Sequence, residues 1–400
     1  MKNKGRYILL TAALAGAYFW HGPQATATAS QAATPLQSVP APPPGPAAPA
    51  TEPSPPCVIP PEYREARAAP RWLSGELGLF VARIDPKTLQ VIDAVGHNAD
   101  EVFPLASSYK VPVLWATLKD VDAGRISVTE RFTVTPEQRS LGGHPADGSD
   151  LPTMLYRMIH NSDNTATDIL HRRVGLAAPQ RLADDLQLCH TRLILPTKTW
   201  WTGQAGMAPA WAGPDAFTAA RGEARLQLAE QLDATARTFT ADQVNRDLER
   251  YFASSWKPED DVKIHNVSTA SEYATLLAHA YLRNGLSPSS AALFDKTMAS
   301  GYGESKLTVR HDQFGGKGGN GHKILSMTGY VHTLAGDHIV YVFFQHNPDE
   351  SYTIPNLRSA FDWINFAVDD LETAKAAPTA QRPSVPAHVA TLPSLTTPDQ

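Results

Sequence analysis

The sequence contains a serine and a lysine whose spacing would let them act as a nucleophile and its base. Lys110 follows Ser107 by three residues, at the start of an apolar segment that includes Val111, Leu114 and Trp115. In a helix, this spacing places a hydroxyl and an amine on one face, about one turn apart. A serine hydroxyl is a poor nucleophile until a base takes its proton, and burial can lower the pKa of a lysine enough for that task. The pair therefore predicts a nucleophile, Ser107, beside a base.

This pattern is weak evidence by itself, because the chain contains it twice. Ser254 and Lys257 have the same spacing, and a capping serine followed by a surface lysine is common at helix starts. Pro258 comes directly after Lys257, and no Ser-x-Asn follows this second copy. We therefore expect Ser107, not Ser254, to react.

A second cluster, Ser162-Asp163-Asn164, lies between two segments with helical periodicity. In a short loop, both outer side chains can point into a cleft, where a hydroxyl relays a proton and an amide binds a substrate amide. The alternative is an ordinary helix boundary, because all three residue types favour helix caps.

A third cluster is the glycine-rich run from Gly315 to Asn320, which contains Lys317. Glycines let the backbone approach a ligand closely, and the ammonium group supplies charge for a carboxylate. The alternative is a glycine-rich turn. A phosphate-binding loop is excluded, because no Ser or Thr that opens a helix follows the lysine.

The order and spacing of the three clusters resemble those of the serine β-lactamases and penicillin-binding proteins, most closely the class A group. Flanking segments are also similar to that family: residues 103–107, 122–126, 161–168, 191–193 and 339–345. The resemblance implies an α+β fold of the β-lactamase/transpeptidase type. In that fold an antiparallel sheet is flanked by helices and an all-helical lobe, with the active site in the cleft.

The resemblance also implies catalytic roles and a serine-hydrolase activity. Ser107 would attack a carbonyl, Lys110 would take its proton, and Ser162 would pass a proton to the departing nitrogen. The backbone N–H groups of Ser107 and Asn320 would form the oxyanion hole. No metal or organic cofactor is implied.

Substrate binding is expected from the other residues of the second and third clusters. Asn164 would hold the amide of the substrate side chain, and Lys317 would attract its carboxylate. Gly318, Gly319 and Asn320 would line the same site. The partner is then a small molecule, either a β-lactam or a peptide like those of peptidoglycan.

Two positions depart from the family pattern. Gly318 stands where the family usually has a threonine or serine, and Thr197 stands where class A enzymes have the glutamate that activates the deacylating water. A general base contributes about 10² to 10⁴ in rate, so its loss would slow deacylation while acylation survives. Asp215, Glu223 or another carboxylate of the inserted segment is a candidate replacement.

Three functions remain open at this stage. The first is a β-lactamase-like hydrolase that acts on cyclic amides. The second is a peptidoglycan-directed peptidase, transpeptidase or esterase that binds penicillin, which the missing glutamate favours. The third is a binding protein without catalytic activity.

The remaining pattern predicts the elements that position these clusters. A helix is expected over residues 61–72. Strands are expected over 77–85, 91–95, 315–319, 324–333 and 338–346, and further helices over 151–160, 177–188, 269–284, 288–299 and 355–374. Residues 200–267 have a different composition and predict an inserted helical segment. In this α+β arrangement both ends of the chain contribute to one sheet.

The chain ends predict export. Lys2, Lys4 and Arg6 precede an apolar run and an Ala-x-Ala site, which is typical of a signal peptide over residues 1–30. A retained membrane anchor is the alternative. Prolines dominate residues 31–61, a predicted linker. Residues 62–375 would be the catalytic domain and 376–400 a disordered tail, in a periplasmic or secreted protein.

Charge and cysteine content add two constraints. The chain has 40 acidic and 35 basic residues and no long basic run, so a nucleic-acid partner is not expected. Membrane contact is expected only through an uncleaved N-terminus. The two cysteines, Cys57 and Cys189, could pair in an oxidising compartment or remain free.

Overall fold

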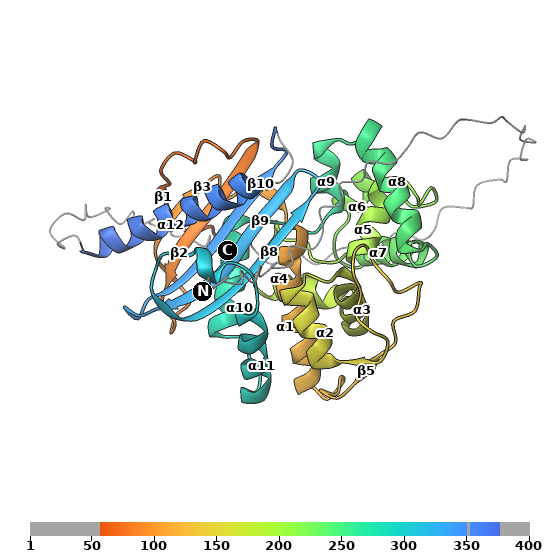
Figure 1. Ribbon diagram of the computed structural model, residues 1–400, viewed down its shortest axis with the longest axis horizontal. Helices are drawn as coiled ribbons and strands as arrows, with labels where there is room; N and C mark the ends of the chain where they lie inside the picture. Colours follow the sequence, from red (N-terminus) through yellow and green to blue (C-terminus); the bar gives the residue numbers. More distant parts are fainter. Residues whose placement is uncertain (1–56, 350–352, 377–400) are drawn as a thin grey trace, which may run out of the picture.

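The computed structural model describes residues 57–349 and 353–376. The predicted signal peptide, most of the predicted linker and nearly all of the predicted tail lie outside these ranges. In the described ranges, no helix combines the length and the hydropathy that a bilayer span requires. A mixed sheet with helices on both faces stands beside a helical lobe (Figure 1).

The sheet has six strands, in the order β1-β3-β2-β10-β9-β8. Only the β1–β3 pair is parallel; the others are antiparallel. The strands are β1 (Arg64–Glu65), β2 (Glu76–Ile84), β3 (Val91–His97), β8 (His311–Gly321), β9 (Ile324–Thr333) and β10 (His338–His346). Because β2 pairs with β10, strands from the two ends of the chain lie together at the centre. The α+β prediction is confirmed.

Alternation along the central strands gives the sheet two apolar faces. In β2, Leu79 and Val81 pack with the cluster of α12 (Ile354–Ala376), whereas Phe80 and Ala82 pack with that of α10 (Ala270–Leu282). Successive side chains of a strand point to opposite faces, so a strand buried on both sides is apolar throughout. The sheet is therefore held between two helical layers.

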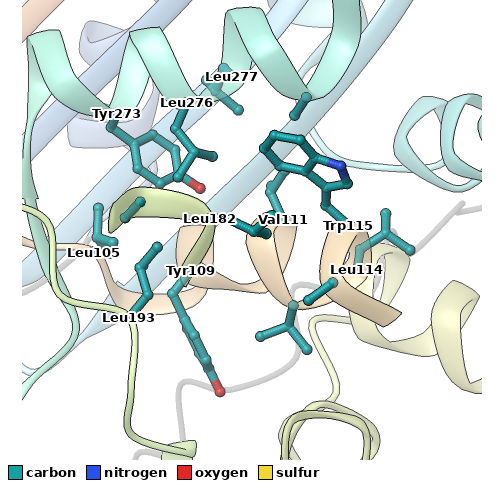
Figure 2. Packing of buried hydrophobic residues seen from close by; sticks show 14 of the residues in the cluster. Leu105, Tyr109, Val111, Leu114, Trp115, Leu182, Leu193, Tyr273, Leu276 and Leu277 are labelled. Atoms are coloured by element: carbon teal, nitrogen blue, oxygen red, sulfur yellow. The ribbon is translucent and has the colours of Figure 1, made fainter. Parts of the chain in front are cut away.

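The helix that follows Ser107 is the centre of the larger apolar cluster. Figure 2 shows Val111 and Trp115 of α1 (Lys110–Asp122) packed among leucines of α4 (Ala177–Asp185) and α10. The remaining helices of the lobe are α2 (Leu151–His160), α3 (Asn164–Val174), α4 (Ala177–Asp185) and α11 (Pro288–Ala299). Two small two-stranded antiparallel sheets complete it, β4 (Val102–Pro104) with β7 (Val267–Thr269) and β5 (Arg131–Phe132) with β6 (Ser149–Asp150). This packing fixes α1 against the sheet.

One predicted element is wrong. Residues 61–72 form no helix; the segment is extended, and Arg64 and Glu65 pair with Val95 and Gly96 of β3. The indole of Trp363 donates a hydrogen bond of 2.8 Å to the carbonyl of Arg67. Charged residues between alanines suggested a surface helix, but contacts with distant parts of the chain decide its conformation.

The inserted segment is helical, as predicted, and begins slightly earlier than expected. It consists of α5 (Thr197–Gln204), α6 (Pro214–Ala219), α7 (Gly222–Ala236), α8 (Ala241–Ser254) and α9 (Pro258–Ile264). Its two ends are joined: the backbones of Arg192 and Val267 exchange hydrogen bonds of 2.8 and 3.0 Å. Ser254 ends α8 and donates its hydroxyl to the carbonyl of Arg250 on an exposed surface. The second Ser-x-x-Lys copy is thus a helix terminus.

Cys57 and Cys189 form a disulfide bond across 132 residues of sequence. The end of the predicted linker is thereby attached to the domain, and Val58 also donates its N–H to the carbonyl of Gln187 at 3.0 Å.

Replacing both cysteines by serine should lower the free energy of unfolding by about 2–4 kcal/mol, because the cross-link restricts the unfolded chain. Urea denaturation of the double variant, beside the native protein with and without reductant, measures this. The double variant and the reduced native protein should share one midpoint; a native midpoint insensitive to reductant would contradict the expectation.

Candidate active site

Ser107 lies in a tight turn that several elements hold in place. Residues Ala106–Tyr109 form a 3-10 turn that leads into α1. Ser108 shares a hydrogen bond of 2.9 Å with the hydroxyl of Ser326 on β9, and its carbonyl accepts one of 2.6 Å from Tyr273. Ala106 has a φ of 43°, a left-handed conformation that is uncommon for a residue with a side chain. The turn is therefore over-determined by its surroundings, as at many functional sites.

Lys110 is completely buried at the start of α1. Its Nζ donates to the carbonyl of Ser162 at 2.6 Å and to Oδ1 of Asn164 at 2.7 Å, and lies 3.2 Å from Oγ of Ser162. No hydrogen bond joins Ser107 Oγ to this amine among the described residues. Burial lowers the pKa of Lys110 to about 7, although Asp163 and Asp168 act in the opposite direction. This shift makes the neutral amine accessible near pH 7.

Ser162 lies between two lysines. Its Oγ accepts a hydrogen bond of 3.0 Å from Nζ of Lys317, in addition to its contact with Lys110. Its φ is 54°, so this residue also adopts the left-handed conformation. The neighbouring Asp163 caps α3 by accepting from the N–H of Ala166 at 3.0 Å, and it pairs with Arg157 at 2.7 Å. This cap and ion pair fix the turn that presents Ser162 and Asn164.

Lys317 lies on β8 and is buried. Burial, and then the nearby Lys110, lower its pKa well below the ordinary value for lysine. Two amines that share one hydroxyl in a buried site repel each other when both are charged. The Lys110–Ser162–Lys317 arrangement is consequently suited to moving a proton.

Gly318, Gly319 and Asn320 continue β8 past the turn of Ser107. A Cβ at Gly319 would lie 2.4 Å from the backbone nitrogen of Ser107 and 2.7 Å from Oγ of Ser326. No side chain fits there, so the close approach of strand and turn requires glycine. The structure thus brings together all eight residues predicted for the site.

A narrow cavity of about 40 Å³ opens beside Ser107. Its lining residues come from the turn of Ser107, from α3, from the two ends of the inserted segment, and from β8 and β9. They are Ala106, Ser107, Asn164, Thr197, Trp200, Trp201, His265, Asn320, Gly321 and Ile324. None of these described residues is a carboxylate. The described lining of this cavity therefore contains no acidic side chain.

Thr197, at the position that the resemblance assigns to glutamate, is built into the wall of this cavity. Its hydroxyl is 2.8 Å from that of Tyr109, and its N–H donates to Asp168 at 2.6 Å. The two carboxylates suggested as replacements do not line the cavity. Asp215 is 85% exposed and pairs with Lys263, and Glu223 is exposed at the start of α7.

Sequence reasoning did not identify His265 as part of the site. It follows α9 at the C-terminal end of the insertion. Because the two ends of the insertion are paired, His265 lies against Trp200 and Trp201 at the N-terminal end. Its ring stacks on Trp200 with 5.3 Å between centroids. No motif or spacing in the sequence marks this histidine.

The arrangement defines a class of protein that comparisons with known proteins identify. Residues 73–364 match the family model described as the β-lactamase enzyme family. The structure is similar to that of PBP-A, with a TM-score of 0.54, 18% identity, and coverage of 79% of this chain and 100% of the other.

It is also similar to two β-lactamases. One is a mutant of the class A β-lactamase of the last common ancestor of Gram-negative bacteria (TM-score 0.51, 20% identity, coverage 75% and 94%). The other is a β-lactamase from Xanthomonas campestris, with a TM-score of 0.52, 16% identity, and coverage of 76% of this chain and 94% of the other. No curated protein matches the sequence. The protein belongs to the β-lactamase enzyme family and has the β-lactamase/transpeptidase fold, as predicted.

Proposed function

We propose that this protein is a serine hydrolase that acylates Ser107 with a β-lactam or a related amide and then hydrolyses the ester. The observation that carries the proposal is the position of Ser162 Oγ, 3.2 Å from one buried amine and 3.0 Å from another, beside the turn of Ser107. Family membership supports it.

In the proposed acylation, Ser107 Oγ attacks the substrate carbonyl and its proton passes to the neutral amine of Lys110. The amine reaches it by leaving its present partners on Ser162 and Asn164. Ser162 then gives a proton to the departing nitrogen and is reprotonated through Lys110. The N–H groups of Ser107 and Asn320 stabilise the oxyanion. Asn164 binds the substrate amide and Lys317 its carboxylate.

A second candidate is a peptidoglycan-directed peptidase, transpeptidase or esterase that binds penicillin. The absence of a carboxylate from the described cavity lining favours it, because an acyl-enzyme without a strong base for water persists. Slow turnover of β-lactams together with activity on D-Ala-D-Ala peptides would select this function.

Time-resolved intact mass spectrometry of the full chain with benzylpenicillin tests the proposal. We expect an adduct of the mass of the drug on the native protein and none on Ser107→Ala. An adduct that clears indicates a hydrolase, and a lasting adduct indicates the second candidate. Absence of labelling by benzylpenicillin, by ester substrates and by a fluorophosphonate would remove both and favour a binding protein without catalysis.

We further propose that the protein acts in the periplasm or outside the cell. The Cys57–Cys189 disulfide supports this location, because such bonds persist in oxidising compartments. The residue composition of the N-terminal 30 residues supports export. Fractionation of the native host, with protease treatment of intact cells, would decide the location; recovery of reduced protein from the cytosol would exclude it.

A further inference from the structure

Two buried nitrogens that belong to residues lining the cavity have no hydrogen-bond partner among the described residues. They are Nε1 of Trp200 and Nδ1 of His265. Trp200 is 3% exposed and His265 1% exposed. A buried polar atom without a partner is destabilising, so each such atom in a native structure requires an explanation. Both residues line the cavity that also contains Ser107.

The hydrogen bonds behind His265 determine which of its nitrogens carries the proton. Nε2 lies 2.6 Å from Oε1 of Gln204, and the amide nitrogen of Gln204 donates to Asp261. Because the carboxylate of Asp261 only accepts, Gln204 must present its NH₂ group to it and its oxygen to His265. Nε2 of His265 therefore holds the proton. Its Nδ1 is an unprotonated nitrogen with a free lone pair.

This orientation is fixed from further away. Asp261 also accepts from Trp256 at 3.3 Å and lies 3.1 Å from Nε2 of His346, whose Nδ1 lies 2.9 Å from Glu76. Burial lowers the pKa of His346, but the hydrogen bonds to Asp261 and Glu76 outweigh it and the net pKa is raised. A protonated His346 donates to both carboxylates. Asp261 is thus kept as an acceptor, which holds Gln204 and His265 in one tautomeric arrangement.

The cavity is large enough for water. At about 40 Å³ it exceeds the volume that one water requires, roughly 10–15 Å³ on the same measure. A water also needs two to four polar partners. Trp200, His265 and Thr197 line this space, and an indole N–H, an unprotonated imidazole nitrogen and a hydroxyl are groups that can bind a water. A water bonded to both orphaned nitrogens would satisfy them.

We propose that this cavity holds the hydrolytic water, and that His265 is the general base that activates it against the Ser107 ester. The inference rests on the proposed acyl-serine chemistry and supplies the base that Thr197 lacks. Water oxygen bonds to the acyl carbon while a water proton moves to Nδ1 of His265. The bond between that carbon and Ser107 Oγ then breaks, and the proton returns from His265 to the serine. The products are a carboxylic acid and free enzyme.

The ionisation of His265 fits this role at neutral pH. Burial lowers its pKa to about 4; Asp261 opposes this shift, and His346 and Arg192 add to it. The ring is therefore neutral and able to accept a proton. As a base weaker than the ideal for pH 7, it would support hydrolysis that is slower than that of a well-matched glutamate.

The test measures formation and loss of the adduct separately, by quenched mass spectrometry of the full chain with benzylpenicillin. His265→Gln keeps an N–H donor towards Gln204 and removes the lone pair at Nδ1. His265→Asn instead places an uncharged amide near Nδ1. For both variants we expect the adduct to form at close to the native rate and to clear about 10²- to 10⁴-fold more slowly. Clearance of either adduct at the native rate would overturn the proposal.

Trp200→Phe provides a milder variant that keeps the aromatic ring and removes only the indole N–H. It should slow clearance by about three- to tenfold, the loss expected for one hydrogen bond to the water. Unchanged clearance would contradict the water site. A native adduct that never clears would overturn this inference and leave Ser107 acylation intact. Absence of any adduct would overturn the proposed function itself.

Discussion

Lys110→Gln should slow acylation of Ser107 by about 10²- to 10⁴-fold, the contribution expected of a general base. The glutamine side chain is one bond shorter than that of lysine and keeps a polar NH₂ group, but it cannot take a proton. The variant should be at least as stable as the native protein at pH 7 and below, because no ammonium group has to be buried. Quenched mass spectrometry gives the acylation rate, and urea denaturation gives the stability.

The pH dependence of acylation of the native protein is the second part of this expectation. The pKa of Lys110 is lowered to about 7, so the amine is neutral above this pH and protonated below it. Acylation should therefore be close to maximal above pH 8 and fall about tenfold per unit well below pH 7. Asp163, Asp168 and Lys317 are the charged groups that influence this amine. A profile that is flat from pH 5 to 8, or shared by Lys110→Gln, would exclude Lys110 as the base.

Gly319→Ala should slow acylation by about 10²- to 10³-fold, the usual cost of losing one oxyanion donor. The added methyl group would lie 2.4 Å from the backbone nitrogen of Ser107. Strand and turn would have to separate, which displaces the N–H group proposed to stabilise the oxyanion. The measurement is again the rate of adduct formation with benzylpenicillin.

Gly318→Ala, one residue earlier on β8, is the matched comparison. Its methyl group would meet the sulfur of Met327 at 3.0 Å, the far end of a flexible side chain that can shift. We expect a much smaller loss of rate than for Gly319→Ala. Equal losses in the two variants would show that general disturbance of the strand, and not the contact with Ser107, is responsible.

The sequence predicted those elements whose pattern is local. Strands β9 and β10 appear with the expected boundaries because apolar runs flank a Gly336-Asp337 turn, and α2 begins and ends as its periodicity predicts. The segment 61–72 was predicted wrongly because its conformation depends on pairing with β3 and on Trp363, which local pattern cannot reveal.

For the site, too, features with a local sequence pattern were predicted, and features that depend on distant contacts were not. Ser107, Ser162 and Lys317 stand in short clusters whose residue types suggest chemistry, and the structure places them together. The spacing of Ser107 and Lys110 alone did not reveal that the amine would be held on Ser162 and Asn164. His265 is a single histidine far from Ser107 in the sequence. Pairing of Arg192 with Val267 brings the two ends of the insertion together, and His265 then lines the same cavity as Ser107. Only the three-dimensional structure identifies it.

The pairing of β2 with β10 determines when the sheet can form during synthesis of the chain. Leu79 and Phe343 lie opposite each other at the centre of the sheet, so no stable sheet exists until nearly the whole chain has been synthesised. Contacts between distant segments are slow to form, and incomplete chains expose apolar surface. Ser107 is encoded early, but its neighbour Ser108 meets its hydrogen-bond partner Ser326 only after β9 has been synthesised. A chain truncated before β10 should therefore lack both the folded sheet and the assembled site.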